Sequence, residues 1–192
     1  MKLEIVVLFS YLLGSIPFGY LLTRIFLKKD IRKIGSGNIG ATNALRTGNK
    51  IIGYSTLCFD ILKAVIPVVY VKMYHSEYIF ITSLCVFLGH LFPVWLKFKG
   101  GKGVATYVGI LCSLDIFLGI FFGIIWIVTF LISKYSSLSS IFACLSIPIF
   151  NFLFLDSNNI FFFVIMLVLV IFTHRENIKR LLNHTESKTK IY

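Results

Sequence analysis

The sequence predicts an all-α integral membrane protein: a polytopic bundle of about seven transmembrane helices, or five, with the N-terminus outside and the C-terminus cytoplasmic. Three observations predict this fold. The mean hydropathy is +0.88 and 57% of the residues are hydrophobic. Apolar runs of about 18 residues recur along the chain, and the basic residues gather in the segments between alternate runs. We treat residues 1–192 as a single transmembrane domain.

The apolar segments cover approximately residues 3–23, 51–71, 78–96, 104–132, 138–155 and 158–173, with polar segments at 24–50, 97–103 and 174–192. The first is too long for the apolar region of a signal peptide, and no small-residue cleavage site follows it. Its stretch "GSIPFG" (14–19) places small residues and Pro17 within a helix. This composition favours close helix packing and a kink, with a groove for a lipid chain as the alternative.

Segment 104–132 would be about 44 Å long as one helix, against a hydrocarbon core of about 30 Å. Asp115 in the middle of a lipid-facing helix would also be costly. We therefore expect two short spans that meet near Asp115, which gives seven spans in total. Five result if 104–132 and 138–173 each cross once.

The distribution of Lys and Arg favours an odd number of spans. With seven spans and the N-terminus outside, Lys2 and Lys72 lie outside and Lys63 lies within a span, which leaves sixteen of 19 on the cytoplasmic side. These sixteen are Arg24, Lys28, Lys29, Arg32, Lys33, Arg46, Lys50, Lys97, Lys99, Lys102, Lys134, Arg175, Lys179, Arg180, Lys188 and Lys190. The positive-inside rule requires this asymmetry. All three polar segments then share the cytoplasmic side, where they can form one site.

Composition excludes several classes of protein. A net charge of +11 suggests a nucleic-acid partner in a soluble protein, but here the positive-inside rule, anionic lipid or an anionic substrate explains it. Four isolated cysteines lie in apolar surroundings, without a Cys-x-x-Cys pair, so we expect neither a disulfide nor a metal. They are Cys58, Cys85, Cys112 and Cys144.

The first motif is "GSGNIGATNALRTG" (35–48). Its Gly35-x-Gly37-x-x-Gly40 spacing matches a dinucleotide fingerprint, but no strand precedes it and Asp60 lies in an apolar segment, so we reject that reading. Glycines let the backbone approach a ligand, and successive N–H groups can bind an anion. The polar side chains that offer hydrogen bonds or a phosphate fork are Ser36, Asn38, Thr42, Asn43 and Arg46. The alternative is a solvated loop that joins two spans.

The second motif is "GHLFPVWLKFKGGKGVAT" (89–106). It is not a Walker A loop, because Trp95 stands where the first glycine should be and Gly103 follows the lysine. Three glycines around a lysine, before a helix from about Val104, still favour an anion site at a helix N-terminus. Lys99 adds positive charge, and we interpret His90 as a packing residue rather than a catalyst. The alternative is a short basic loop.

The third motif is "HRENIKRLLNHTES" (174–187), whose apolar spacing predicts an interfacial amphipathic helix. His174 stands where this helix leaves the membrane and can move a proton near neutral pH. Asn177 lies one turn later on the same face. Glu186 could pair with a basic residue and hold the segment. The alternative is a basic juxtamembrane tail.

Asp60 and Lys63 are three residues apart in one apolar segment, so they can face each other across a helical turn. Charges within a membrane are site candidates by default. We favour a structural ion pair that faces the bundle.

In order, "GSIPFGYLLTR", "GSGNIGATNALRTG", "GHLFPVWLKFKGGKGVAT" and "HRENIKRLLNHTE" resemble the bacterial membrane glycerol-3-phosphate acyltransferases that use acyl phosphate, the PlsY family, along essentially the whole chain. The resemblance implies acyl transfer from acyl phosphate to the sn-1 hydroxyl of glycerol 3-phosphate. The products would be lysophosphatidic acid and phosphate. It implies no cofactor or metal, and a multi-pass protein of a bacterial inner membrane with a cytoplasmic active site. We expect a monomer, coupled to the enzyme that makes acyl phosphate.

The resemblance associates Ser36, Arg46, His174 and Asn177 with activity, Gly100, Gly101 and Gly103 with glycerol-phosphate binding, and Glu186 with structure. The chemistry of the residues adds Lys102 to the catalytic set, and it adds Gly35, Gly37, Asn38, Gly40, Thr42, Asn43 and Lys99 to the substrate-binding set.

Acyl phosphate is already activated, so direct attack by the glycerol hydroxyl needs no covalent enzyme intermediate, and positioning with charge stabilisation can supply most of the rate. The base is His174 or the substrate's own phosphate, whose second pKa is near 6. The rival hypothesis is a transporter or binding protein for a phosphorylated metabolite. Transporters usually show internal repeats, and we find none.

Overall fold

A computed structural model of the chain describes residues 2–155 and 159–189. The described residues are helical, with no strand among them, so the all-α prediction is confirmed. The chain divides into two compact units, Met1–Asp115 and Ile116–Tyr192. Two features of the sequence interpretation, Lys190 and the start of segment 158–173, lie outside the described residues.

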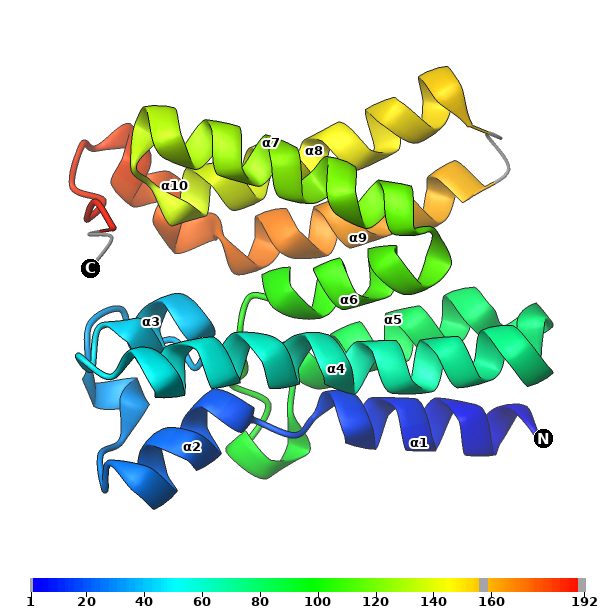
Figure 1. The fold of residues 1–192 in the computed structure, drawn as a ribbon, viewed down its shortest axis with the longest axis horizontal. Helices are drawn as coiled ribbons and strands as arrows, with labels where there is room; N and C mark the ends of the chain where they lie inside the picture. The colour runs from blue at the N-terminus through cyan, green and yellow to red at the C-terminus, as the bar shows by residue number, and fades with distance from the viewer. Residues whose placement is uncertain (1, 156–158, 190–192) are drawn as a thin grey trace. The chain divides into compact units, whose positions relative to one another are not determined.

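The first unit is built on a long helix, α4 (Lys50–Tyr74), against which the other helices pack. Those helices are α1 (Leu3–Gly14), α2 (Phe18–Phe26), α3 (Ala41–Leu45), α5 (Ile79–Leu91) and α6 (Val104–Leu114). In Figure 1, α1 and α2 follow one another along one side of α4. Three single 3-10 turns lie in the connections: η1 (Ile31–Lys33), η2 (Ser76–Tyr78) and η3 (Val94–Leu96). The polar segment 24–50 thus contains regular structure, namely η1 and α3.

The kink expected at Pro17 is a break between α1 and α2, whose axes differ by 40°. Proline has no N–H for the helical ladder and its ring clashes with the preceding turn. The small residues around the break let backbones approach each other. A Cβ on Gly14 would lie 2.8 Å from the Cα of Val86, and one on Gly19 would meet the carbonyl oxygen of Ile39. Close packing is therefore confirmed, and both glycines face protein backbone rather than a lipid groove.

The second unit contains α7 (Ile116–Ser133), α8 (Ser136–Phe154), α9 (Ile160–Thr173) and α10 (Arg175–Leu182). α7 packs against α8, and α8 against α9. Asp115, with φ −153° and ψ 124°, is extended and separates α6 from α7, as the sequence predicts. The amphipathic helix expected after the last apolar segment is α10, which is bent by 62° from α9.

Within residues 2–155 and 159–189, four stretches are long and apolar enough to cross a membrane: Lys50–Tyr74, Ser76–Leu96, Ile116–Ser133 and Ser136–Phe154. The bent pairs α1 with α2 and α9 with α10 raise the number to six. α6 is the remaining apolar helix, and at about 16 Å it is shorter than the hydrocarbon core of about 30 Å. The number of complete crossings and the orientation of the termini stay predictions.

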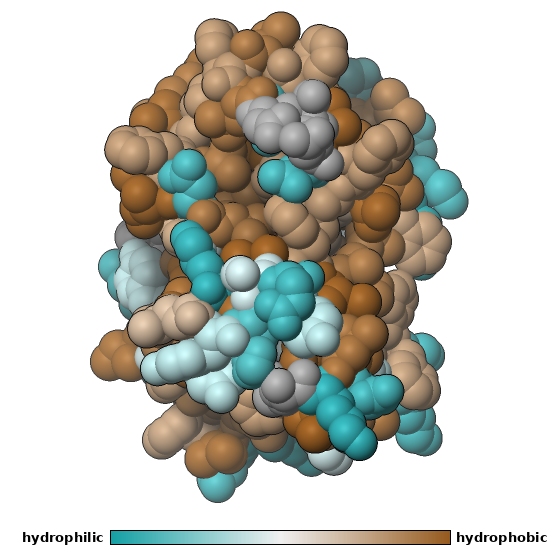
Figure 2. Space-filling view, turned by 90° about the vertical axis from the view of Figure 1, so that its right-hand side faces the viewer, coloured by the Kyte–Doolittle hydropathy of each residue, from teal (hydrophilic) through white to brown (hydrophobic). Residues whose placement is uncertain are grey.

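Large hydrophobic side chains cover much of the surface, as the space-filling view shows (Figure 2). Ile132 is 81% exposed and Phe161 is 80% exposed. An exposed apolar surface of this extent would promote aggregation in water, but it is compatible with the hydrocarbon core of a bilayer. The chain is thus a multi-pass integral membrane protein.

The contact between α1 and α5 provides a test of this packing. Gly14→Ala should lower the free energy of unfolding by about 1–3 kcal/mol, because the added methyl group would press on the backbone at Val86. Gly123→Ala in α7 is the matched control, since nothing lies within 4 Å of its added Cβ. We expect Gly123→Ala to be neutral or stabilising by up to about 1 kcal/mol. Thermal unfolding in detergent measures both, and equal effects would contradict the assignment.

Candidate functional site

The first motif is organised around one buried amide, that of Asn43 in α3. Its Nδ2 donates to the carbonyl oxygens of Ile31 (3.1 Å), Ile34 (2.9 Å) and Asn38 (2.8 Å). Its Oδ1 accepts from the N–H of Ser36 at 3.0 Å. The side chain is 2% exposed, so these bonds are made out of reach of bulk water. Asn43 thus folds a loop of twelve residues around itself.

Gly35 and Gly37 have φ of +52° and +72°, a left-handed conformation that L side chains disfavour. Gly35 also has no room for a side chain, because a Cβ there would touch Oδ1 of Asn43 and lie 2.8 Å from Cδ and 3.3 Å from Nη1 of Arg46. The Arg46 side chain therefore lies against Gly35, next to the exposed Ser36. The structure brings these three predicted site residues together.

Asn38 and Gly40 form the turn that leads into α3. The N–H of Gly40 donates to Oδ1 of Asn38 at 2.9 Å, and Gly40 is the residue before the first helical position. Thr42 lies in α3 and is partly buried. The amides of Asn38 and Asn43 both hold the loop itself.

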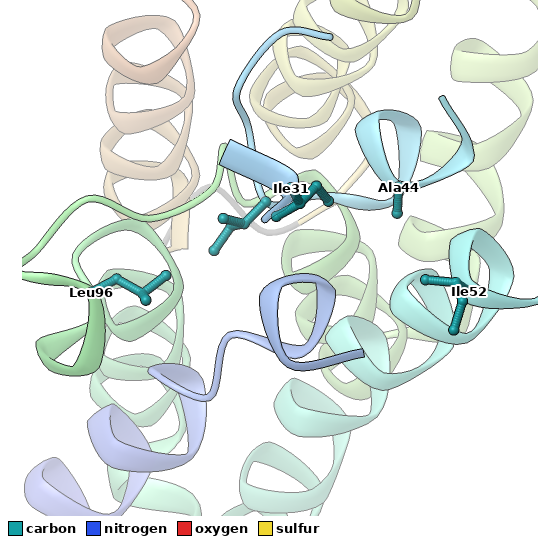
Figure 3. Close-up of a cluster of buried hydrophobic side chains, with 5 residues drawn as sticks. Ile31, Ala44, Ile52 and Leu96 are labelled. Carbon is teal, nitrogen blue, oxygen red and sulfur yellow. The ribbon is translucent and has the colours of Figure 1, made fainter. Parts of the chain in front are cut away.

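A small hydrophobic cluster anchors the first motif to the second. It consists of Ile31, Ile39, Ala44, Ile52 and Leu96. In Figure 3, Ile31 lies between Leu96 of η3 and the pair Ala44 and Ile52 of α3 and α4. The two glycine-rich loops of the first unit therefore share one core.

The glycines of the second motif face protein. The N–H of Gly100 donates to the carbonyl oxygen of Leu91, and that of Gly101 to the carbonyl oxygen of His90, both at 3.1 Å. A Cβ on Gly100 would meet the same two carbonyl oxygens, and one on Gly101 would meet Nε2 of His90. Gly103, with φ +83°, precedes α6, which begins at Val104 as expected, and a Cβ on it would meet the Phe87 ring. These glycines let the loop lie directly on the end of α5.

Lys102 is held between the buried Gly101 and Gly103, and is itself partly buried, whereas Lys99 is exposed. The loop that carries them turns tightly, because Lys97 and Phe98 are both left-handed, with φ of +53° and +60°. The N–H of Phe98 closes the turn on the carbonyl oxygen of Pro93 at 3.0 Å.

Beneath the second motif lies a buried ionic cluster. Nζ of Lys63 is 2.8 Å from Oδ1 of Asp60, so the two charges face each other across one turn of α4, as their spacing predicts. The same Nζ is 2.9 Å from Nδ1 of His90 and donates to the carbonyl oxygen of Ile16 at 2.9 Å. Their side chains are at most 4% exposed. His90 therefore joins the Asp60–Lys63 pair, a link that the sequence did not predict.

One signal in the sequence points to that link. His90 and Lys63 both lie in apolar segments, and polar groups in such segments pair with one another. However, the two residues are 27 positions apart and lie on different helices, so the sequence spacing did not indicate that they are in contact.

In the second unit the third motif is held by Glu186. Its Oε1 accepts from Nδ2 of Asn177 (2.6 Å) and Oγ of Ser137 (2.7 Å), and its Oε2 accepts from Nε of Arg180 (2.7 Å). The expected pairing with a basic residue is thus present. Ser137 was missed, although it belongs to a serine-rich stretch (136–140) at the start of α8.

His174 lies at the junction of α9 and α10 and is 2% exposed. Its Nδ1 is 2.9 Å from the carbonyl oxygen of Val170, which can only accept, so Nδ1 carries the proton. The neutral ring then has its basic lone pair on Nε2.

Arg32, which lies just before the first motif, is paired with Asp30. Nε and Nη2 of Arg32 donate to the two carboxylate oxygens of Asp30 at 2.9 and 2.7 Å. This contact lowers the pKa of Asp30 to about 2. Among the described residues, no group of three His, Cys, Asp or Glu side chains is arranged to hold a metal ion.

The fold and the site define a class: a polytopic integral membrane protein whose glycine-rich, basic loops are folded against its helices. A family model described as glycerol-3-phosphate acyltransferase matches residues 4–184. The chain belongs to the glycerol-3-phosphate acyltransferase family.

Relatives support this membership over the full length. The chain is 68% identical to the glycerol-3-phosphate acyltransferase of Pelagibacter ubique, over 100% of both chains. It is 50% identical to that of Brucella anthropi, over 94% of this chain and 90% of that one.

Two crystal structures of PlsY (YgiH), an integral membrane glycerol 3-phosphate acyltransferase, are similar in fold and 39% identical in sequence. Its glycerol 3-phosphate form has a TM-score of 0.91 and matches 97% of this chain and 95% of that chain. Its lysophosphatidic acid form has a TM-score of 0.87 and matches 96% and 94%.

The Glu186 carboxylate predicts a pH dependence of stability. Burial raises its pKa, but the hydrogen bonds from Arg180, Ser137 and Asn177 outweigh burial and hold the pKa below the ordinary 4.5. Because the folded state binds the proton more weakly than the unfolded state, the stabilisation is complete above pH 4.5 and is lost as the pH falls through the lower, folded-state pKa.

Thermal unfolding of the wild type and Glu186→Gln, from neutral pH to well below 4.5, measures this effect. We expect the wild type to be more stable by about 1 kcal/mol at neutral pH, since the group is partly solvated. The difference should shrink in acid. A difference that is independent of pH would show that the charge contributes nothing.

Proposed function

We propose that this chain transfers an acyl group from acyl phosphate to the sn-1 hydroxyl of glycerol 3-phosphate, giving lysophosphatidic acid and phosphate. We place the reaction at the cytoplasmic face of a bacterial inner membrane. The observation that carries the proposal is the arrangement of Arg46 against Gly35, which precedes the exposed Ser36, in a loop shaped by the buried Asn43. The names of the relatives, and the glycerol 3-phosphate and lysophosphatidic acid forms of a structure 39% identical, support the acceptor and the product.

The chemistry of the loops suits two phosphorylated substrates. Each of the two loops in the first unit combines glycines with a cation: Arg46 in the first and Lys102 in the second. A guanidinium binds phosphate oxygens through two parallel hydrogen bonds, whereas a lysine acts as a point charge. We assign the acceptor phosphate to the second loop, in line with the role that the resemblance gives its glycines, and the donor phosphate to the first loop, with Thr42 and Lys99 as further polar contacts.

In the proposed reaction, the sn-1 oxygen attacks the acyl carbonyl carbon. The bond from that carbon to the phosphate oxygen then breaks, and phosphate leaves with the electron pair. Ser36, Arg46 and Lys102 stabilise the phosphates and the developing oxyanion. A leaving group as good as phosphate makes an acyl-enzyme unnecessary, so the protein's contribution is position and charge.

The hydroxyl proton has two candidate acceptors, Nε2 of His174 and the phosphate of the substrate, whose second pKa is near 6. The tautomer of His174 supports the first, since Nδ1–H donates to Val170 and leaves Nε2 basic. Asn177 and Glu186 hold the segment that follows His174.

The remaining predicted residues act by holding the loops. Asn38 and Asn43 bond to loop backbone, and the glycines of the second motif allow contact with α5. We propose that their effect on substrate binding comes through the shape of these loops. A monomer, coupled to the enzyme that makes acyl phosphate, remains our prediction for the assembly.

The donor is the first test. Labelled glycerol 3-phosphate is offered to the purified chain with acyl phosphate, then with acyl-CoA. We expect lysophosphatidic acid from acyl phosphate alone, and a loss of at least about 100-fold in Ser36→Ala and in Arg46→Ala. Arg32→Ala is the matched control: it removes an arginine of the same segment that is paired with Asp30, and should stay within about threefold.

Each other outcome has a definite meaning. Product from acyl-CoA would contradict the assigned donor. Bound glycerol 3-phosphate without any product would favour a transporter or binding protein.

The base is the second test. His174→Ala should lower kcat by about 100-fold or more and remove the acidic limb of the pH–rate profile, because general base catalysis typically contributes that much. Near-normal turnover in this variant would assign the proton to the substrate phosphate. Circular dichroism and thermal unfolding of the variant establish that it is folded.

A further inference from the structure

The ionic cluster beneath the second motif has no part in the reaction proposed above, yet its three charged or titratable side chains are at most 4% exposed. Nζ of Lys63 forms an ion pair with Oδ1 of Asp60 and has two hydrogen-bond partners, Nδ1 of His90 and the carbonyl oxygen of Ile16. A lysine ammonium cannot accept a hydrogen bond, so Nδ1 of His90 accepts and Nε2 carries the ring proton. The orientation of the His90 ring is thereby fixed.

The fixed ring lies against Gly101 of the same motif. Nε2 of His90 is so close to Gly101 that a Cβ there would clash with it, and the main-chain oxygen of His90 accepts from the N–H of Gly101. Gly101 is buried and directly precedes Lys102. Any rotation of the ring would therefore shift the backbone that carries Lys102.

On its other side the cluster holds the break between α1 and α2. Lys63 donates to Ile16 within the break, and its Nζ lies 5.9 Å from the centre of the Phe18 ring at the start of α2. The next residue, Gly19 of α2, lies against the carbonyl oxygen of Ile39 in the first motif. The cluster thus contacts the second loop at Gly101 and is linked to the first loop through Phe18 and Gly19 of α2.

We propose that Asp60, Lys63 and His90 are positioning residues, which hold the Gly101–Lys102 segment in register with the first loop and so set the affinity for the phosphorylated acceptor. The proposal rests on the proposed function for the identity of that acceptor. Buried charges suit this role, because their hydrogen bonds are directional and leaving one unpaired is costly, whereas apolar contacts can slide.

The experiment compares lysines on one helix. Lys63→Met should raise KM for glycerol 3-phosphate by about tenfold or more while KM for acyl phosphate changes by less than about threefold. Lys72→Met is the matched control, because Lys72 also lies in α4 and donates to two carbonyl oxygens, those of Ser113 and Leu114, at the end of α6 opposite the second loop. Lys72→Met should lower thermal stability and leave both KM values unchanged.

A second variant keeps the test valid if Lys63→Met folds poorly. Asp60→Asn with Lys63→Met removes both charges at similar volume, which buried pairs often tolerate. We expect this double variant to unfold near the wild-type temperature and still to show the raised KM. Normal KM for glycerol 3-phosphate in a folded variant would overturn the proposal, as would an equal rise in both KM values.

The contact between ring and loop has its own readout. Gly101→Ala and His90→Ala should be strongly non-additive in KM, because removal of the ring makes room for the new methyl group. Additive effects would show that the ring does not hold the loop. Gly123→Ala serves as the glycine control.

Equilibrium binding of labelled glycerol 3-phosphate separates the two proposals. A wild type that binds the ligand but transfers no acyl group would refute the proposed function alone. The positioning role would then still be judged by whether Lys63→Met weakens binding about tenfold relative to Lys72→Met. Equal binding by these two variants would refute the positioning role alone.

Discussion

The first unit depends on the placement of one buried ammonium. Lys63 sits in an apolar helix, and a charge there is tolerated only if its donors are satisfied by groups that stay in place. Those groups come from three parts of the chain: Asp60 on α4, His90 at the end of α5, and the carbonyl oxygen of Ile16 in the broken first span. Satisfying one lysine therefore fixes α1, α2, α4 and α5 against each other.

The break at Pro17 is part of the same arrangement. A continuous helix would direct the Ile16 carbonyl oxygen along its own ladder, whereas the break leaves it able to accept from Lys63. Irregular backbone within an apolar segment is acceptable when it is buried in protein and bonded there. The break also allows α2 to diverge by 40° and to place Gly19 against the first loop. The break between α1 and α2 therefore helps to position the loop of the first motif.

Sequence reasoning reached those features that local rules determine. The apolar segments, a kink at Pro17, an interruption near Asp115 and the Asp60–Lys63 pair all follow from composition or from short spacings. The link from Lys63 to His90 and the links from Asn43 to three carbonyl oxygens join positions whose distance depends on tertiary packing. The glycines show the same limit. Their pattern indicated close backbone approach, but a ligand and a neighbouring helix require the same absence of a Cβ.

In this structure the glycines allow close approach of protein groups. Gly100 and Gly101 lie on the end of α5, and Gly35 lies under Arg46, so the loops gain their shape from protein contacts before any substrate binds. Transfer from an activated donor gains most from groups that are already placed where charge develops, since reorganising them during the reaction would raise the barrier. A loop that rests on buried backbone and a fixed imidazole meets that requirement better than a solvated one. In the reaction proposed for this chain, the glycines that leave no room for side chains and the buried ions would therefore contribute in the same way, by limiting movement of the loops.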